Sequence, residues 1–433
     1  MKHPKFHLAI LLIILLSINN TSFAQSADTK IANLLNQADW FALSDEYPKL
    51  KNDMQSEMLQ KMSEAMIGLY FNQPQPAIEA IDWLLVNAQE EIGFENISNM
   101  ILFKSIILGE QGQYADCVEN INSFIAQVSE LVDAEALSAH IQVMGFYEKM
   151  LNETPPEVIR PNGNTEIPFT IENVSRGNLM FVPVTIHGKA YQFIFDTGAN
   201  CSFVSERFAN EVGLRITQEN FEINGVKSDI GKRGTIDSLM VGDIVLKNPN
   251  ILIGSPNEEV DTVYQIDAVL GMDFIRFIGE TQILPEQNKI VFPIEKTKLP
   301  ATGRNLMFSN RQLYLKAYSK KEKLLLHFDT GNVKSDLYDT YYQKYKKEIH
   351  KKGKKKEARR GGYGGILNLD AYEMPKISFT VGNATFALSN VEVLLDKGIV
   401  MQSAEDGSLG MDFITLFKKV IINLEDMFLE VEK

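Results

Sequence analysis

The chain has 433 residues, of which 45% are hydrophobic and 23% charged, and its formal net charge at pH 7 is −13. This composition excludes a disordered, collagenous or coiled-coil protein, and the length predicts two to four domains of roughly 100–200 residues each. Cys117 and Cys201 are too few for a disulfide framework, and the scattered histidines without paired cysteines form no zinc pattern, so we expect no metal and no cofactor.

Residues 1–24 have the pattern of a secretory signal peptide. Lys2 and Lys5 form a basic start, the apolar run LAILLIILLSI follows, and small residues surround the expected cleavage point after Ala24. An uncleaved membrane anchor is the alternative, but the run is shorter than the roughly 20 residues that a membrane span requires. We therefore expect an exported protein, periplasmic or secreted, with no stable membrane insertion after signal cleavage.

Residues 25–151 are predicted to form an all-α domain of four to six helices, because their apolar residues recur at helical spacing. Turn-like points recur near Trp40, Pro76 and Tyr114, and the segment GQYADCVENI (112–121) resembles the turn into the second helix of a tetratricopeptide-type repeat. An ordinary helical bundle is the alternative. The region up to residue 155 carries almost all of the net negative charge, which argues against a nucleic-acid partner and leaves a protein partner open.

The next segment, residues 152–167, is predicted to be a linker, because its prolines and Asn-Gly steps suit neither helix nor strand. Beyond it, alternating runs such as FVPVTIHGKAYQFIF (181–195) predict short strands joined by Gly or Asn turns. The C-terminal two-thirds of the chain is therefore predicted to be mostly β.

Within this β region the sequence repeats itself. Four landmarks return in the same order at nearly constant offset, which predicts two copies of one β lobe: lobe 1 (168–300) and lobe 2 (301–433). The matched pairs are Phe195–Gly198 with Phe328–Gly331, Ser202 with Ser335, Gly225 and Val241-Gly242 with Gly365 and Val381-Gly382, and Leu270–Ile275 with Leu409–Ile414.

Each lobe resembles a retropepsin-type aspartic protease. In that family apolar residues lead into Asp-Thr/Ser-Gly, and an apolar-apolar-Gly segment follows later in the lobe. FIFDTGANCSFV with AVLGMDFI fits this pattern in lobe 1, and LLHFDTGNVKSDL with GSLGMDFI fits it in lobe 2. The resemblance covers about residues 168–433. It implies a multidomain protein in which the all-α domain precedes a mostly β, bilobal acid-protease-like barrel pair.

The resemblance also implies an aspartic endopeptidase that hydrolyses peptide or protein substrates, with Asp196 and Asp329 as the catalytic dyad. Two carboxyls held close together cannot both ionise, so they share one proton over a wide pH range. The ionised carboxylate acts as general base on a water molecule, and the protonated partner polarises the scissile carbonyl. The alternative is a non-catalytic binding protein that uses the protease-like fold as a scaffold and the helical domain to recruit a partner.

The residues around each aspartate have physical reasons to be there. Glycine two positions after the aspartate lets the backbone approach closely, and threonine one position after it can turn its hydroxyl toward the other lobe. The supporting residues are Thr197, Gly198, Thr330 and Gly331.

Hairpin flaps over the cleft are expected between each Asp-Thr-Gly and the following Val-Gly turn. The candidates are Gly225 and Val226 in lobe 1, with Tyr363, Gly364 and Gly365 in lobe 2. Surface glycine loops are the alternative. Lobe 2 also contains seven extra residues between Ser335 and Gly365, within which the Lys-rich run 344–360 is expected to be a solvated helix or loop.

Four further residues lie near these motifs. Asn332 stands where lobe 1 has Ala199, and its side chain either donates to Asp329 or reflects drift. His327 is expected to be a strand histidine with its hydrogen bonds satisfied. Asp273 and Asp412 are expected to be structural, at the start of a helix.

Overall fold

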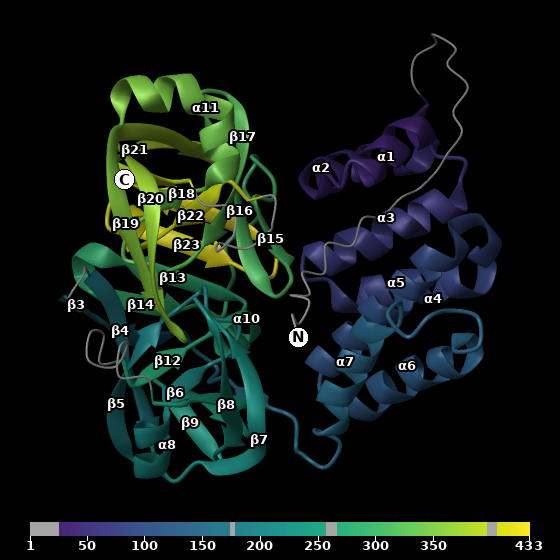
Figure 1. The fold of residues 1–433 in the computed structure, drawn as a ribbon, viewed down its shortest axis with the longest axis horizontal. Coiled ribbons are helices and arrows are strands. Elements are labelled where there is room, and N and C mark those ends of the chain that lie inside the picture. The colour runs from purple at the N-terminus through teal and green to yellow at the C-terminus, as the bar shows by residue number, and fades with distance from the viewer. Residues whose placement is uncertain (1–25, 174–177, 257–265, 396–404) are drawn as a thin grey trace. The chain divides into compact units, whose positions relative to one another are not determined.

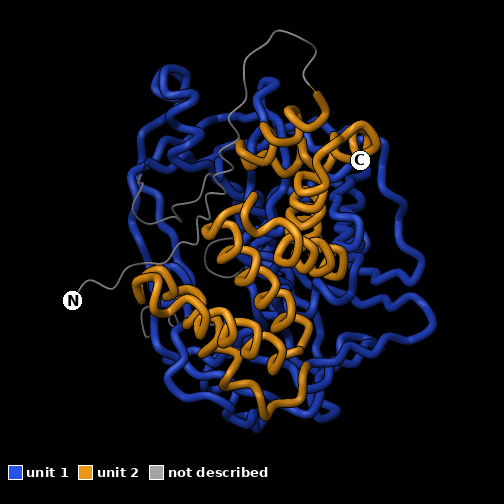
Figure 2. Tube along the Cα trace, turned by 90° about the vertical axis from the view of Figure 1, so that its right-hand side faces the viewer, with its two compact units in different colours: residues 1–7, 156–433 blue, residues 8–155 orange. Residues whose placement is uncertain are grey.

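The computed structural model describes residues 26–173, 178–256, 266–395 and 405–433 (Figure 1). It divides at residue 155 into two compact units, coloured separately in Figure 2. We call them the helical unit (26–155) and the β unit (156–433). The predicted order, an α domain followed by a mostly β region, is confirmed. The predicted signal peptide lies outside the described residues.

The helical unit has seven α-helices among its described residues, more than the four to six predicted. Ser26, Asp39 and Ser56 cap three of them by accepting hydrogen bonds from backbone amides of the first turn, which fixes where those helices begin. The helices are α1 (Ala27–Asn36), α2 (Trp40–Leu50), α3 (Glu57–Tyr70), α4 (Pro74–Asn87), α5 (Gln89–Glu110), α6 (Tyr114–Val128) and α7 (Ser138–Glu148).

These helices pack in sequential pairs, α1 with α2, α3 with α4, and α5 with α6, and α7 packs on α6. Two of the turn-like points in the sequence coincide with the starts of α2 and α6, and the third lies inside the first turn of α4. A Cβ at Gly68 would lie 2.7 Å from the Cβ of Ala77, so α3 and α4 approach closely only because residue 68 is glycine. Among the described residues, no helix has the length and apolar character needed to cross a membrane.

The β unit begins with the strands and helices of lobe 1 and the segment before it. These are β1 (Glu157–Ile159), β2 (Thr165–Pro168), β3 (Thr170–Asn173), β4 (Asn178–Ile186), β5 (Lys189–Phe195), β6 (Phe203–Ser205), α8 (Glu206–Val212), β7 (Arg215–Asn224), β8 (Ser228–Thr235), β9 (Ser238–Val241), β10 (Ile244–Lys247), β11 (Ile251–Gly254), β12 (Ala268–Leu270), α10 (Met272–Ile278), β13 (Glu280–Leu284) and β14 (Lys289–Phe292).

Lobe 2 continues the unit with a similar series. Its elements are β15 (Leu306–Ser309), β16 (Gln312–Ser319), β17 (Glu322–Phe328), β18 (Asp336–Leu337), α11 (Asp339–Lys352), β19 (Lys354–Gly362), β20 (Gly365–Val381), β21 (Ala384–Leu394), β22 (Gly407–Leu409), α12 (Met411–Ile414), β23 (Lys419–Asn423) and β24 (Phe428–Glu432).

The two lobes repeat one strand order. Lobe 1 contains β4-β5-β12-β6-β11-β8-β7, and lobe 2 contains β16-β17-β22-β18-β21-β20-β19. In each lobe, the strand that leads into Asp-Thr-Gly runs parallel to the strand of the later Leu-Gly segment. These pairs are β5 beside β12 and β17 beside β22. Each aspartate therefore follows a central strand whose last residue, Phe195 or Phe328, is fully buried.

A five-stranded sheet joins the lobes, in the order β2-β14-β13-β23-β24. Its central pairing sets Glu280 of β13 opposite Asn423 of β23. The fully buried Glu280 carboxylate accepts hydrogen bonds from the Asn423 side chain (2.9 Å) and from the backbone amide of Thr297 (2.7 Å). Because this sheet takes strands from both lobes, it holds them in one unit.

The prediction that residues 152–167 contain no strand is wrong. β1 pairs with β10 and β2 pairs with β14, so residues 157–159 and 165–167 of the segment form edge strands of the β unit. Between them, the Arg160 guanidinium donates to the backbone carbonyls of Ile278, Phe292 and Pro293, at 2.9 Å in each case. Proline is tolerated here because edge strands leave part of their backbone unpaired.

The seven extra residues of lobe 2 lie in one helix. α11 has 14 residues, whereas its counterpart α8 has 7. The Lys-rich run 344–360 is therefore not one solvated helix or loop: it forms the second half of α11 and most of β19.

Candidate active site

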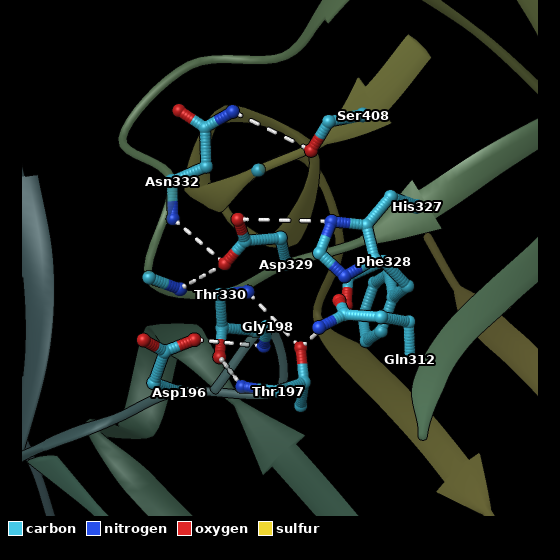
Figure 3. Close-up of polar contacts among 12 residues, drawn as sticks. Asp196, Thr197, Gly198, Gln312, His327, Phe328, Asp329, Thr330, Asn332 and Ser408 are labelled. Atoms are coloured by element: carbon cyan, nitrogen blue, oxygen red, sulfur yellow. Dashed lines mark hydrogen bonds and ion pairs between the residues drawn. The ribbon is translucent and has the colours of Figure 1, made fainter. Parts of the chain in front are cut away.

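Asp196 and Asp329 occupy equivalent places in the two lobes. Each leaves the end of a central strand, and each is anchored by its backbone amide to the neighbouring parallel strand. Asp196 N donates to Leu270 O and Asp329 N donates to Leu409 O, both at 3.0 Å. The two Asp-Thr-Gly loops face each other across the interface between the lobes (Figure 3).

The two threonines lock the loops together. Thr197 N donates to the hydroxyl of Thr330 and Thr330 N donates to the hydroxyl of Thr197, both at 3.0 Å. Each hydroxyl in turn donates to a carbonyl of the opposite lobe, Thr197 to Phe328 O (2.8 Å) and Thr330 to Phe195 O (2.6 Å). Both threonines are fully buried, so water does not compete for these hydrogen bonds.

The two glycines allow each loop to approach the opposite carboxyl. A Cβ at Gly198 would lie 2.4 Å from Cγ of Asp329, and a Cβ at Gly331 would lie 2.3 Å from Oδ2 of Asp196. Both distances are shorter than any real Cβ contact, so only glycine fits. The same approach brings the carboxyls of Asp196 and Asp329 close enough for each to change the pKa of the other.

Backbone amides hold each carboxylate in a fixed orientation. Oδ1 of Asp196 accepts from Gly198 N (2.7 Å) and Ala199 N (3.1 Å). Oδ1 of Asp329 accepts from Gly331 N (2.9 Å) and Asn332 N (3.1 Å). One oxygen of each carboxyl is thereby occupied, and the other is left for the partner aspartate or for a reactant.

Burial raises the pKa of both aspartates. The neighbouring charge of Asp329 raises the pKa of Asp196 further, to about 7, against the opposing effect of the backbone donors. The pKa of Asp329 is also raised by burial, while the neighbouring Asp196 carboxyl and the backbone amides of Gly331 and Asn332 act in the opposite direction. The pair therefore holds a proton more tightly than two separate aspartates would.

Of the two alternatives for Asn332, the structure excludes donation from its side chain to Asp329. Its Nδ2 donates instead to the hydroxyl of Ser408 at 3.4 Å, and only its backbone amide reaches Asp329 (Figure 3). The loop turns so that its amides converge on the carboxylate, and this directs the side chain away. Ala199 makes the same backbone contact in lobe 1, so the two loops bind their aspartates alike.

His327 differs from its prediction too, because its hydrogen bonds are not satisfied. Its Nδ1 lies 3.9 Å from Oδ2 of Asp329, and its Nε2 has no hydrogen-bond partner among the described residues. The side chain is 6% exposed. The sequence shows His327 only as a residue on the same strand face as Asp329 and carries no signal of its burial.

Asp273 and Asp412 lie at the starts of α10 and α12 and fasten the loops that follow each Asp-Thr-Gly. Asp273 Oδ1 accepts from the backbone amide and the hydroxyl of Ser202, both at 2.8 Å. Asp412 Oδ1 makes the same two contacts with Ser335, at 2.8 and 2.6 Å. Burial raises the pKa of Asp273 to about 6 and also raises that of Asp412.

The predicted flap residues lie at the tips of two hairpins, β7–β8 in lobe 1 and β19–β20 in lobe 2, and the tips touch. Lys227 N donates to Tyr363 O at 3.4 Å. A Cβ at Gly225 would lie 2.5 Å from the same oxygen, and one at Gly364 would lie 2.0 Å from Lys227 O. Gly364 has φ +83°, a conformation that favours glycine.

The remaining flap candidates are part of the same contact. Val226 lies at the lobe 1 tip against Gly362, and Gly365, with φ +151°, lies against the side chain of Lys227. The ring of Tyr363 packs edge-on against Phe203 of lobe 1 at 5.1 Å between centroids. The structure therefore brings all five candidates together at one junction between the lobes.

Arg360 is a residue that the sequence analysis did not single out. It lies on β19 and forms an ion pair with the buried carboxylate of Asp336. Its Nη2 also lies 3.6 Å from Oε2 of Glu392. Its positive charge also lowers the pKa of Asp329 against the effect of burial. A single arginine within a Lys-rich run carried no signal that would separate it from its solvated neighbours.

Known proteins resemble this chain in part. Residues 182–274 match the family model described as aspartyl protease. Among proteins of curated function, none matches the chain in sequence.

Solved structures also show a limited likeness. Conglutin gamma, a basic 7S globulin from lupine seeds, and the basic 7S globulin from soybean each have a TM-score of 0.37 and 11% identity, covering 63% of this chain and 95% of theirs. A retropepsin-like aspartic protease from Rickettsia conorii has a TM-score of 0.23 and 17% identity, covering 33% of this chain and 95% of its own. At these TM-scores the three likenesses carry no argument about activity. The family match itself gives the chain an aspartyl-protease-like domain in residues 182–274, which includes Asp196.

Proposed function

We propose that the chain is an exported aspartic endopeptidase whose two lobes are a fused retropepsin-like pair. The observation that carries the proposal is the contact of each glycine with the opposite carboxyl, Gly198 with Asp329 and Gly331 with Asp196. A pair of solvated turn aspartates would need neither this approach nor the threonine hydrogen bonds that hold it.

The geometry supports acid–base chemistry on a bound water molecule. The ionised carboxylate of the dyad takes a proton from water, and the oxygen of that water attacks the scissile carbonyl carbon. The protonated carboxyl donates to the carbonyl oxygen as negative charge develops there. The aspartate that took the proton from water then passes it to the amine nitrogen, and the other aspartate takes a proton back from the diol. The C–N bond breaks, the amine and the carboxylic acid leave, and no covalent link to the chain is formed.

In this proposal the two hairpins act as flaps that close over the dyad. Their mutual contact through Lys227 and Tyr363 supports this role, because it joins a tip of one lobe to a tip of the other. A substrate strand would enter after the tips separate. When the tips close over it, the hairpins would exclude bulk water from the dyad.

The helical unit is proposed to be a tetratricopeptide-like module that binds a protein partner. Its sequential helix pairs and the spacing of the α2, α4 and α6 starts support this reading. Export is proposed from the signal-like residues 1–24 alone.

The test is cleavage of a peptide library by the full mature chain across pH 3–8, followed by mass spectrometry. The proposal expects internal cleavage with a bell-shaped pH profile, since one carboxyl must be ionised and the other protonated. Absence of cleavage at every pH would favour the non-catalytic binding protein instead.

A further inference from the structure

The two lobes differ at three register-equivalent positions beside the dyad. In lobe 1, Ile194 of β5 lies opposite Phe181 of β4 and Val269 of β12. In lobe 2, the corresponding positions hold His327, Tyr314 and Ser408. An apolar set next to Asp196 is thus matched by a hydrogen-bonding set next to Asp329.

His327 is the member of this set that faces the dyad. Its Nδ1 lies 3.9 Å from Oδ2 of Asp329, the oxygen that the backbone amides leave open (Figure 3). This separation is a close contact rather than a hydrogen bond, and catalytic hydrogen bonds commonly tighten only when a substrate is bound. Ile194 offers no donor to Asp196 in lobe 1.

The surroundings of His327 favour its neutral form. Burial lowers its pKa, and the acidic side chains of Glu405 and Asp196 oppose this effect without reversing it. The ring of Tyr314 packs against the imidazole of His327, with 5.8 Å between the ring centroids. Burial also raises the pKa of Tyr338, next to Glu405 and Asp329, so this phenol stays protonated. A neutral imidazole with its proton on Nδ1 presents one donor to Asp329.

We propose that His327 is a positioning residue that places the negative charge of the dyad on Asp329 and the shared proton on Asp196. This rests on the proposed protease function, and it names Asp329 as the general base and Asp196 as the general acid. A donor stabilises the ionised form of the carboxyl it faces and so breaks the symmetry of the pair. The charge of Arg360 acts in the same direction on Asp329.

A direct test is carboxyl and imidazole NMR on the full chain, which needs no cleavage. In the wild type, the Cγ shifts of ¹³C-labelled aspartate, assigned with Asp196→Asn and Asp329→Asn, should show Asp329 ionised and Asp196 protonated near pH 5. The ¹⁵N shifts of His327 should show the proton on Nδ1. A proton on Nε2, or two aspartates that titrate identically, would overturn the proposal even if His327→Leu fails to fold.

Substitutions extend the test. His327→Leu should raise the titration midpoint of Asp329, and the acid limb of the kcat profile, by about 0.5–1 pH unit, because a close donor stabilises the charged carboxylate by less than a full hydrogen bond to a charged group would. His327→Gln, which retains a neutral donor, should restore more than half of the shift. The matched change His350→Leu on α11 should leave both titrations in place. Equal curves for wild type and His327→Leu, or no difference between the Leu and Gln variants, would overturn the proposal.

The two hypotheses fail separately. If no peptide is cleaved but the carboxyl titrations follow these expectations, the proposed protease function is wrong and the role of His327 in the dyad stands. If peptides are cleaved but the titrations of wild type and His327→Leu coincide, His327 has no such role and the protease function stands.

Discussion

Thr197 and Thr330 exchange hydrogen bonds reciprocally, each backbone amide donating to the other hydroxyl at 3.0 Å. The residues come from different lobes and are separated by 133 positions in the chain. Their contact fixes the distance between the two loops and hence between the two carboxyls. Each hydroxyl also donates to a carbonyl of the opposite lobe, which makes four hydrogen bonds in all. Both the stability of the lobe interface and the geometry of the dyad therefore depend on these four hydrogen bonds.

Removing one threonine hydroxyl should destabilise the β unit. Thr197→Val breaks the hydrogen bond to Phe328 O and leaves the buried Thr330 amide without a partner, so the free energy of unfolding should fall by about 2–4 kcal/mol. Denaturant unfolding measures this. Thr197→Ser should lose much less, and Thr170→Val, at an exposed position, should have almost no effect. Equal stability of the Val and wild-type chains would mean that the interlock is not stabilising.

A methyl group at position 198 should separate the dyad. Gly198→Ala places Cβ 2.4 Å from Cγ of Asp329, so the loops must move apart and peptide cleavage should fall by at least about 100-fold, the lower range for losing acid–base catalysis. Gly163→Ala is the matched control, because a Cβ there meets no atom within 4 Å. Turnover by Gly198→Ala at the rate of that control would contradict the described approach of the loops.

Stability should depend on pH through the raised carboxyl pKa values. Asp196, with a pKa of about 7 against a usual 3.8, binds a proton more tightly in the folded than in the unfolded chain. Its contribution is fully present below the usual value and is lost as pH rises toward 7, at a slope of at most about 1.4 kcal/mol per pH unit for one proton. Asp273, with a pKa of about 6, acts in the same direction.

Unfolding in denaturant at pH 4, 5.5 and 7 measures this dependence. Asp196→Asn should flatten the decline between pH 4 and pH 7, whereas Asp243→Asn, in an exposed turn, should follow the wild type. If Asp196 instead made the wild-type chain more stable as the pH rises from 4 to 7, the pH dependence would have the opposite sign. That result would contradict the raised pKa of Asp196.

The contact between the tips of the β7–β8 and β19–β20 hairpins should slow hydrogen exchange at the Lys227 amide. Tyr363→Ala removes the ring that packs on Phe203, a contact worth about 0.5–1.5 kcal/mol, so exchange of the Lys227 amide should become up to about tenfold faster. Hydrogen-exchange mass spectrometry of the β7–β8 tip measures the change. Tyr318→Ala, at a 40% exposed position, should leave it unaltered. Unchanged exchange in Tyr363→Ala would show that Tyr363 does not hold the tips together.

Much of the fold was predictable because it is repeated. Two Asp-Thr-Gly segments with matched downstream Leu-Gly segments indicated two equivalent lobes, and their strand orders agree. The strands of residues 157–168 were not predictable, because their prolines signal a break and their pairing depends on distant edges at β10 and β14. The sequence pattern underestimates the number of helices in the helical unit, because several helices are short and only a few residues separate them.

The candidate site shows the same division. The positions of Asp196 and Asp329 follow from local sequence, since each needs only a strand, a threonine and a glycine. The direction of the Asn332 side chain depends on the loop conformation, and the open Nε2 of His327 depends on which groups β16 and β22 present to it. Such orientations are tertiary properties, and a comparison of the two lobes at equal register is the signal that would have revealed the asymmetry.

The most direct test of the central claim compares three full mature chains on one cleaved peptide at the pH optimum: the wild type, Asp196→Asn and Asp329→Asn. Each substitution should lower turnover by at least about 100-fold while circular dichroism shows an intact fold, because catalysis requires one base and one acid. Wild-type turnover by either variant would contradict the two-aspartate mechanism.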